Sequence, residues 1–270
     1  MGVHDLDTVN VPVQVRAMVS TFLREADVAA PGLIEMLYLT GSVALDDYRP
    51  GVSDIDFLAV TARVMSHDHV AVMADIHRDM PNAPHVDGVY LDRAALATLP
   101  DDEEVVPHAV DGVLRADQLC GELNPMLWLT LDQCGIAVRG PAVRELGLRV
   151  APSRARTWNL NNLASYWKPL AGRIRQAMVG RDAAKAVYND GVMWSVLGPA
   201  RLHYTLATGA VTSKTGAGQY VVDHFPQWSS LAQLAVACRD GEPIEFVTAD
   251  ALAAADMIDT IVDDAWSRWG

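Results

Sequence analysis

Two apolar segments on either side of a polar, turn-rich stretch restrict the fold of this chain more than any other feature. Residues 33–40 form a mostly apolar run that ends at Gly41-Ser42, and residues 55–60 form a second run. Both have the length and residue types of β-strands, and the glycine, proline and aspartate residues between them are typical of turns. The sequence therefore predicts two buried strands that bracket a short turn segment.

Two carboxylates stand at the start of the second predicted strand. Successive side chains of a strand point to opposite faces, so Asp54 and Asp56 are expected on one face, while Ile55 and Phe57 point into the core. Converging carboxylates can hold hard divalent cations such as Mg²⁺, which also bind phosphate oxygens and assist in-line displacement. Either Asp-x-Asp or Gly-Ser alone is common turn chemistry. Together, beside two strands, they predict a phosphoryl-transfer site.

Three further residues are expected to contact the phosphates of a nucleotide at this site: Gly41, Ser42 and Ser53. A glycine permits close approach of the backbone to a ligand, and a serine hydroxyl with neighbouring amides can bind terminal phosphates.

The other segments indicate an α/β first half and a helical second half. Helical spacing or capping residues predict helices over 11–22, from Ser66 to Met80, and over 124–134, and further strands are predicted over 85–91 and 136–138. Residues 100–125 are acidic and interrupted by glycines, which is typical of a loop or lid. Beyond Pro152, helical spacing recurs over 153–179, 182–208, 218–239 and 249–269, with Pro169 and Pro199 expected to kink two of these helices.

The motif Gly41-Ser42 followed by Ser53-Asp54-Ile55-Asp56 resembles the signature of the DNA polymerase β-like nucleotidyltransferase superfamily. The wider layout is similar to the streptomycin/spectinomycin (AadA-like) aminoglycoside adenylyltransferases. The resemblance implies an α+β fold, with a polymerase β-like nucleotidyltransferase domain of mixed sheet and helices over residues 1–150. It implies a C-terminal α-helical bundle over residues 151–270 that contacts substrate and clamps ATP.

The same resemblance implies a reaction and a set of residues. AMP would move from ATP to a hydroxyl of a small molecule, with Mg²⁺ as cofactor, release of pyrophosphate, and an aminoglycoside-type antibiotic as acceptor. Asp54 and Asp56 would be metal ligands. Asp87, at a position where the family has a glutamate, would be the catalytic base and a third metal ligand, although its side chain is shorter by one methylene. Arg201 and Lys214, thirteen residues apart as in the family, would contact the ATP phosphates.

The acceptor side departs from the family pattern. Asp190 and Trp194 are expected to contact the acceptor, but Gly191 stands where streptomycin/spectinomycin enzymes have an acid that contacts the drug. Asp240 stands where they have an aromatic residue near the adenine. Two alternatives therefore stay open: adenylylation of another hydroxyl, on a metabolite, a different antibiotic or a protein, and a non-catalytic nucleotide-binding module. Retention of Asp54 and Asp56 argues against the module.

Charge and cysteine content limit which substrates and which cellular compartment are expected for this chain. The chain has 21 basic and 34 acidic residues and a net charge of −13, which disfavours nucleic acid as the main substrate. A cationic small molecule would be attracted, although such a charge also keeps many proteins soluble. Three scattered cysteines indicate reduced thiols, the start of the chain lacks the pattern of a secretion signal, and no membrane span is expected. We expect a cytoplasmic monomer.

Overall fold

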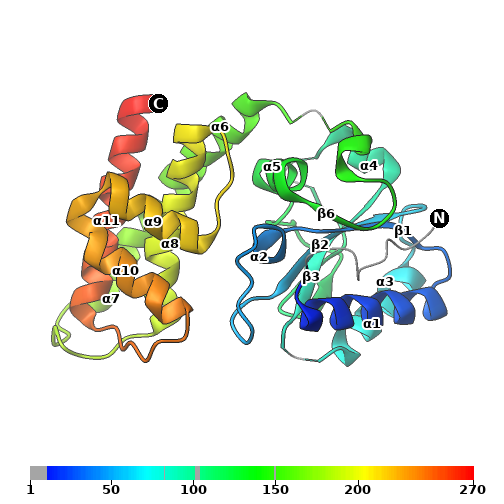
Figure 1. Cartoon of the computed structure of the whole chain (residues 1–270), viewed down its shortest axis with the longest axis horizontal. Coiled ribbons are helices and arrows are strands. Elements are labelled where there is room, and N and C mark those ends of the chain that lie inside the picture. The colour runs from blue at the N-terminus through cyan, green and yellow to red at the C-terminus, as the bar shows by residue number, and fades with distance from the viewer. Residues whose placement is uncertain (1–10, 82, 101–103, 149) are drawn as a thin grey trace. The chain divides into compact units, whose positions relative to one another are not determined.

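The computed structural model describes residues 11–81, 83–100, 104–148 and 150–270, so the first ten residues, whose composition argued against a secretion signal, lie outside the described residues. The chain divides into two compact units, Met1–Val150 and Ala151–Gly270, which are called the N-terminal unit and the C-terminal unit below (Figure 1). None of the described helices has the length and apolar character needed to cross a membrane.

A mixed six-stranded sheet organises the N-terminal unit. Its strands are β1 (Ile34–Leu39), β2 (Ile55–Thr61), β3 (Val86–Asp92), β4 (His108–Val110), β5 (Val113–Arg115) and β6 (Ile136–Arg139), in the spatial order β5-β4-β3-β2-β1-β6. β2 and β3 are parallel, whereas every other neighbouring pair is antiparallel. The strands predicted over 33–40, 55–60, 85–91 and 136–138 are confirmed.

Helices cover both faces of this sheet. They are α1 (Val13–Ala29), α2 (Gly41–Ala44), α3 (His67–Asp79), α4 (Arg93–Thr98) and α5 (Pro125–Cys134), with a 3₁₀ turn at Val143–Leu146. Figure 1 shows α1 and α3 on one side of the sheet and α4 and α5 on the other. Ile55 and Phe57 point to the first side and pack with Phe22, as predicted from the period of two. The opposite face of β2 packs with α5 through Leu58 and Trp128.

The prediction of a loop or lid over residues 100–125 was wrong for its central part. Residues 101–103 lie outside the described residues, but β4 and β5 form a hairpin that extends the sheet beyond β3. The hairpin turn is Asp111-Gly112, with φ of 54° and 69°. An Asp-Gly pair with positive φ at both positions is the preferred two-residue hairpin turn. The two strands have only three residues each, which is too short for a periodic pattern to emerge.

The C-terminal unit is helical, as predicted, so the α+β fold class is confirmed. It contains α6 (Pro152–Asn162), a π-helical segment η3 (Leu163–Trp167), α7 (Lys168–Met178), α8 (Asn189–Thr208), α9 (Lys214–His224), a 3₁₀ turn (Pro226–Trp228), α10 (Ser229–Arg239) and α11 (Thr248–Trp269).

Two helix predictions in this unit need correction. The helix expected from residue 182 begins only at Asn189, and the helix expected over 218–239 begins earlier, at Lys214, and is divided by the turn at Pro226. Proline cannot donate a backbone hydrogen bond, which explains the break there. Pro169 is the second residue of α7, just after the π-helical segment, while Pro199 lies inside the continuous helix α8.

Candidate active site

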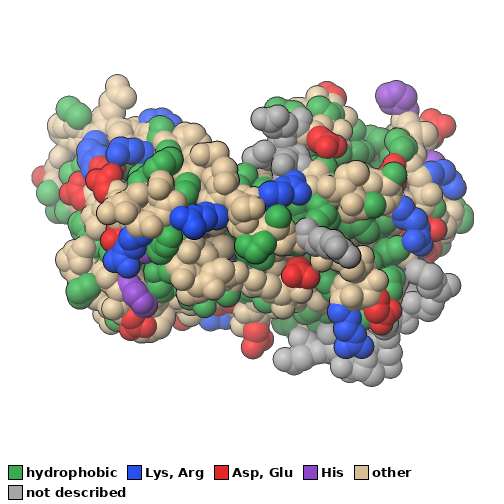
Figure 2. All heavy atoms as spheres, turned by 90° about the horizontal axis from the view of Figure 1, so that it is seen from above, with side chains coloured by type: hydrophobic (Ala, Val, Ile, Leu, Met, Phe, Trp, Pro, Cys, Tyr) green, Lys and Arg blue, Asp and Glu red, His purple; other side chains and the backbone are tan. Residues whose placement is uncertain are grey.

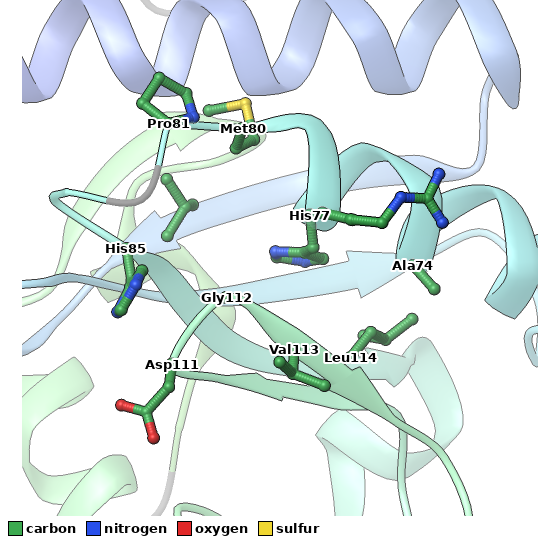
Figure 3. A pocket seen from close by; sticks show the side chains of 11 residues that line it. Ala74, His77, Met80, Pro81, His85, Asp111, Gly112, Val113 and Leu114 are labelled. Carbon is green, nitrogen blue, oxygen red and sulfur yellow. The ribbon is translucent and has the colours of Figure 1, made fainter.

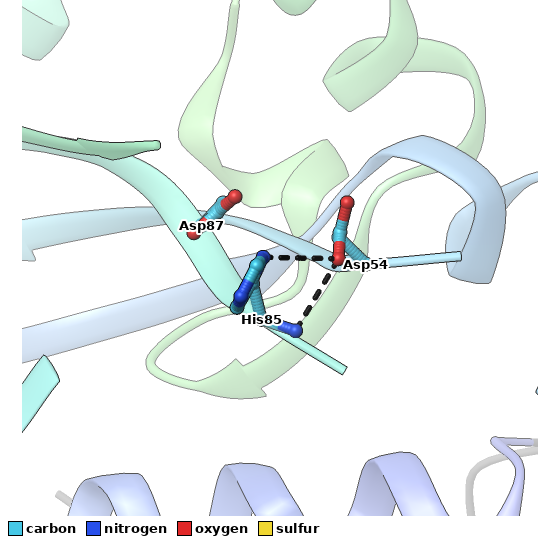
Figure 4. A group of neighbouring side chains, drawn as sticks. All are labelled: Asp54, His85 and Asp87. Atoms are coloured by element: carbon cyan, nitrogen blue, oxygen red, sulfur yellow. Dashed lines mark hydrogen bonds and ion pairs between the residues drawn. The ribbon is translucent and has the colours of Figure 1, made fainter. Parts of the chain in front are cut away.

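The parallel pairing of β2 and β3 brings the predicted carboxylates together. Asp56 lies opposite Asp87 in the register of the two strands. Asp54 precedes β2 by one residue, and because Ile55 N donates to His85 O over 2.8 Å, it lies beside His85. One ligating atom from each of Asp54, His85 and Asp87 lies within 4.8 Å of the others (Figure 4). These three residues are called the Asp-His-Asp group below.

His85 is bound to Asp54 in two ways. Its backbone N–H donates to Asp54 Oδ1 over 3.3 Å, and its ring Nδ1 lies 3.6 Å from the same oxygen. The sequence analysis did not identify His85 as a site residue. The available signal was its position two residues before Asp87, because side chains two apart on a strand share one face.

The β4–β5 hairpin holds the carboxylate of Asp87 in place. Asp111 N donates to Oδ2 over 2.8 Å, and Gly112 N donates to Oδ1 over 2.9 Å. Burial raises the pKa of Asp87 above its ordinary value. The two amide hydrogen bonds oppose that rise in pKa, and the neighbouring charge of Asp54 adds to it. The result is a well-oriented carboxylate with increased proton affinity.

Gly41 permits Asp56 to lie against the turn that begins α2. Thr40 N donates to Asp56 O over 2.9 Å, and a Cβ added to Gly41 would lie 1.7 Å from Asp56 Oδ2. Gly41 also has a φ of 55°, a conformation that other residues rarely adopt. Glycine at this position is therefore required for two independent reasons.

The two predicted serines have different surroundings. Within the described part of the chain, Ser42 Oγ is buried and has no hydrogen-bond partner. A buried hydroxyl without a partner is costly, so a ligand that contacts it would be stabilised. Ser53 is 7% exposed, and its Oγ accepts a hydrogen bond from Arg49 N over 3.0 Å. Ser53 thus closes the turn before β2.

The Asp-His-Asp group has the donor set of a divalent-cation site. It offers two carboxylates and one imidazole nitrogen. Each oxygen of Asp87 accepts one amide and keeps a second lone pair, so the hairpin does not prevent ligation. Asp56 is not a member of the group, although the sequence analysis assigned it to the metal. These residues fit a bound cation on chemical grounds.

A separate pocket lies between α3 and the β4–β5 hairpin. It has a volume of about 370 Å³ and is lined mainly by apolar side chains. Figure 3 shows His77 and His85 at its sides and Asp111 at its lower edge. The pocket shares His85 with the Asp-His-Asp group but contains neither Asp54 nor Asp87.

Two of the four predicted residues of the C-terminal unit, Lys214 and Trp194, are in contact. Lys214 is the first residue of α9, and its Nζ lies 5.8 Å from the centroid of the Trp194 ring. Arg201 lies seven residues after Trp194 on α8 and therefore on nearly the same helix face. Its Nε donates to Thr212 O over 3.2 Å, in the loop that leads to Lys214. Asp190 is exposed one turn before Trp194.

Comparisons with known proteins agree with this geometry. Residues 19–115 match the family model of the nucleotidyltransferase domain, a span that contains the Gly41-Ser42 turn and all three predicted aspartates. Among solved structures, a spectinomycin adenyltransferase from Enterococcus faecialis, determined with ATP and spectinomycin, matches with a TM-score of 0.67. The two sequences are 14% identical, and the match covers 92% of this chain and 99% of the other, which shows a shared fold. No curated protein matches the sequence. Residues 19–115 therefore match a nucleotidyltransferase domain, as the Gly-Ser and Asp-x-Asp motifs predicted.

Proposed function

We propose that this nucleotidyltransferase moves AMP from ATP to a hydroxyl of a cationic, aminoglycoside-type small molecule and releases pyrophosphate. The observation that carries the proposal is the convergence of Asp54 and Asp87 from neighbouring strands, beside a glycine turn that packs on Asp56. The similar solved structure, named as a spectinomycin adenyltransferase with ATP and spectinomycin, supports both the nucleotide and the acceptor class.

The chemistry requires one bond to form and one to break. The acceptor hydroxyl oxygen bonds to the α-phosphorus of ATP, the bond between that phosphorus and the oxygen bridging to the β-phosphate breaks, and pyrophosphate leaves. Asp87 takes the hydroxyl proton, with its carboxylate held in place by two amides of the hairpin turn. Asp54, Asp56 and Asp87 would hold Mg²⁺, which when bound offsets the negative charge of the phosphates.

Five residues are proposed to act at the phosphates of ATP. Gly41 and Ser42 form the turn beside Asp56, and the buried hydroxyl of Ser42, which has no partner among the described residues, is the strongest support for a phosphate there. Ser53 holds the turn before β2 in shape. Arg201 and Lys214 supply positive charge to the triphosphate, which fixed cations stabilise as charge moves to the leaving group.

Asp190 and Trp194 are proposed to contact the acceptor. Trp194 is 41% exposed and Asp190 lies one helical turn before it, and an indole and a carboxylate are groups that suit a cationic, ring-containing molecule. The net charge of −13 favours attraction of such a molecule. Figure 2 shows Lys and Arg side chains interspersed with Asp and Glu side chains on one face, a distribution that gives no continuous basic surface in that view.

An acceptor screen tests the proposal. The full-length chain is incubated with ATP, Mg²⁺ and a panel of aminoglycosides, metabolites and proteins, and mass spectrometry follows the gain of one AMP unit while pyrophosphate is measured. We expect an aminoglycoside to gain one AMP unit with the wild-type chain and to gain none with Asp54→Asn. Gain only on a metabolite or protein would replace the acceptor class, and tight ATP binding without any transfer across the panel would overturn the proposal.

A further inference from the structure

We infer that His85 is a metal ligand in this chain, and that its imidazole increases the preference of the site for a first-row transition ion such as Mn²⁺ over Mg²⁺. The inference rests on the divalent cation of the proposed function and adds a ligand and an ion preference to it. His85 is not among the ligands that the Asp-x-Asp motif predicts.

The ring of His85 is oriented by its neighbours. Its Nδ1 lies 3.6 Å from Asp54 Oδ1, while its backbone N–H donates to that same oxygen over 3.3 Å. On the other edge, a Cβ added to Gly112 would lie 3.4 Å from His85 Cδ2, so the ring packs against the backbone of the hairpin turn. Figure 4 shows the ring between the two carboxylates. The imidazole is therefore held with a nitrogen facing Asp54.

The position of Asp56 strengthens this assignment. Its carboxylate lies against Gly41, whereas the ligating atoms of Asp54, His85 and Asp87 come within 4.8 Å of one another. Among the described residues, the group of three ligating side chains that forms here thus contains a histidine beside Asp54 and Asp87. Asp87 is fixed by two amides from the same turn that supports the His85 ring.

A nitrogen ligand changes which ion is preferred. Mg²⁺ is a hard ion that takes oxygen ligands and keeps several waters. Imidazole instead suits first-row transition ions, whose affinity at a given site rises from Mn²⁺ towards Cu²⁺. Mn²⁺ is the weakest of that series and also accepts carboxylates, so it is the most stringent probe. Oxygen ligands alone also bind Mn²⁺ more tightly than Mg²⁺, so the contribution of the imidazole is the decrease in this preference when His85 is replaced.

Electron paramagnetic resonance of the full-length chain with Mn²⁺ tests the inference without measuring turnover. Inorganic tripolyphosphate is used as co-ligand because it contains no nitrogen, so any ¹⁴N coupling to the bound Mn²⁺ comes from the protein. We expect ¹⁴N modulation of the Mn²⁺ signal in the wild-type chain, and its loss in His85→Gln. Competition with Mg²⁺ is expected to show Mn²⁺ binding at least about tenfold more tightly, an advantage that should be smaller in His85→Gln.

The loss of Mn²⁺ affinity in His85→Gln is expected to be about 10- to 100-fold, which is the usual effect of mutating residues that hydrogen-bond to metal ligands. His67→Gln is the matched control, because His67 is exposed at the start of α3, and it should keep both the coupling and the affinity. If Mn²⁺ bound to the wild-type chain shows no ¹⁴N coupling, the inference is wrong. That measurement needs no variant, so it is valid even if His85→Gln misfolds. AMP transfer in Mg²⁺ is scored separately, so a failed acceptor screen and a missing nitrogen ligand give different results.

Discussion

The ammonium of Lys214 lies 5.8 Å from the centroid of the Trp194 ring, within the range of a cation–π interaction. Trp194 in turn donates from Nε1 to Tyr166 Oη over 3.1 Å, and Tyr166 belongs to the π-helical segment before α7. A residue assigned to ATP and a residue assigned to the acceptor are therefore in contact. Binding of one substrate can be expected to affect the residue that contacts the other.

The first prediction concerns Lys214. If its ammonium contacts the triphosphate, Lys214→Ala raises the KM for ATP when the contact is equal in the ground and transition states, and lowers kcat when the contact strengthens during transfer. Steady-state kinetics with varied ATP distinguish the two. Lys168→Ala is the control, because Lys168 forms an exposed ion pair with Asp263 in the same unit and such pairs contribute little. Unchanged constants in Lys214→Ala would exclude it from the ATP site.

The second prediction concerns the Asp-x-Asp pair. Asp54→Asn and Asp56→Asn each remove one negative charge at constant volume, so we expect AMP transfer to be abolished while the circular dichroism spectrum stays that of the wild type. Asp68→Asn, at an exposed position in the first turn of α3, should transfer AMP normally. Wild-type turnover in either site variant at ordinary Mg²⁺ would contradict the assignment.

The third prediction follows from the contact between Gly41 and Asp56. Gly41→Ala places a methyl where Asp56 Oδ2 now lies and also strains a backbone with positive φ, so transfer should fall at least as far as in Asp56→Asn. Gly51→Ala separates the two effects. Gly51 has a φ of 76° but nothing lies within 4 Å of an added Cβ, so this variant has the strain without the collision. Equal activity of the two variants would show that the collision is unimportant.

Local sequence signals were sufficient for the strands that carry or border the predicted aspartates. Apolar runs predicted β1, β2 and β3, and Ser66 was recognised as the cap of α3, where its side chain accepts from His69 N over 3.3 Å. Asn124 likewise caps α5. These features are set by residues a few positions apart, so they can be recognised without knowledge of tertiary packing.

Contacts between distant segments could not be predicted in the same way. The role of His85 depends on the register of β2 against β3, and the two amides that hold Asp87 come from residues about 25 positions later in the chain. The contact of Lys214 with Trp194 depends on how α9 packs beside α8. The Asp111-Gly112 hairpin, in contrast, could have been predicted from the sequence. An Asp-Gly pair between two valines is a local turn signal, but it was interpreted as part of the acidic loop that surrounds it.

The fourth prediction concerns Asp87. Asp87→Ala should lower kcat by about 10²-fold, the usual size of a general-base effect, whereas Asp87→Glu should keep measurable activity because a carboxylate remains near the site. Asp111→Asn is the control, because it removes a neighbouring charge but keeps the backbone amide that donates to Asp87. Rates at saturating ATP and acceptor provide the comparison. An unchanged rate in Asp87→Ala would assign the base to another residue.

The fifth prediction concerns the stability of the N-terminal unit as a function of pH. His77 is 3% exposed, lies among Phe22, Phe57 and Tyr90, and its Nε2 is 2.7 Å from Tyr90 Oη. Burial lowers the pKa of His77 to about 4, below its ordinary value of 6.5. Above pH 6.5 the imidazole is neutral in both the folded and the unfolded chain. Between pH 6.5 and 4 the unfolded chain binds a proton that the folded chain does not, so stability falls with decreasing pH.

Linkage between those two pKa values gives a loss of about 2 kcal/mol in the free energy of unfolding from pH 7 to pH 5. Equilibration in urea, followed by pulse hydrogen exchange of peptides from α3 and β3, measures this free energy for the N-terminal unit. Other groups titrate in the same range, so the quantity compared is the difference in pH dependence between the wild type and His77→Gln, which cannot titrate but can still hydrogen-bond Tyr90. His67→Gln, at an exposed position, should retain the wild-type slope. If His77→Gln shows the same loss of stability towards pH 5 as the wild type, His77 is not the group responsible, and the decline must come from carboxylates or from other histidines.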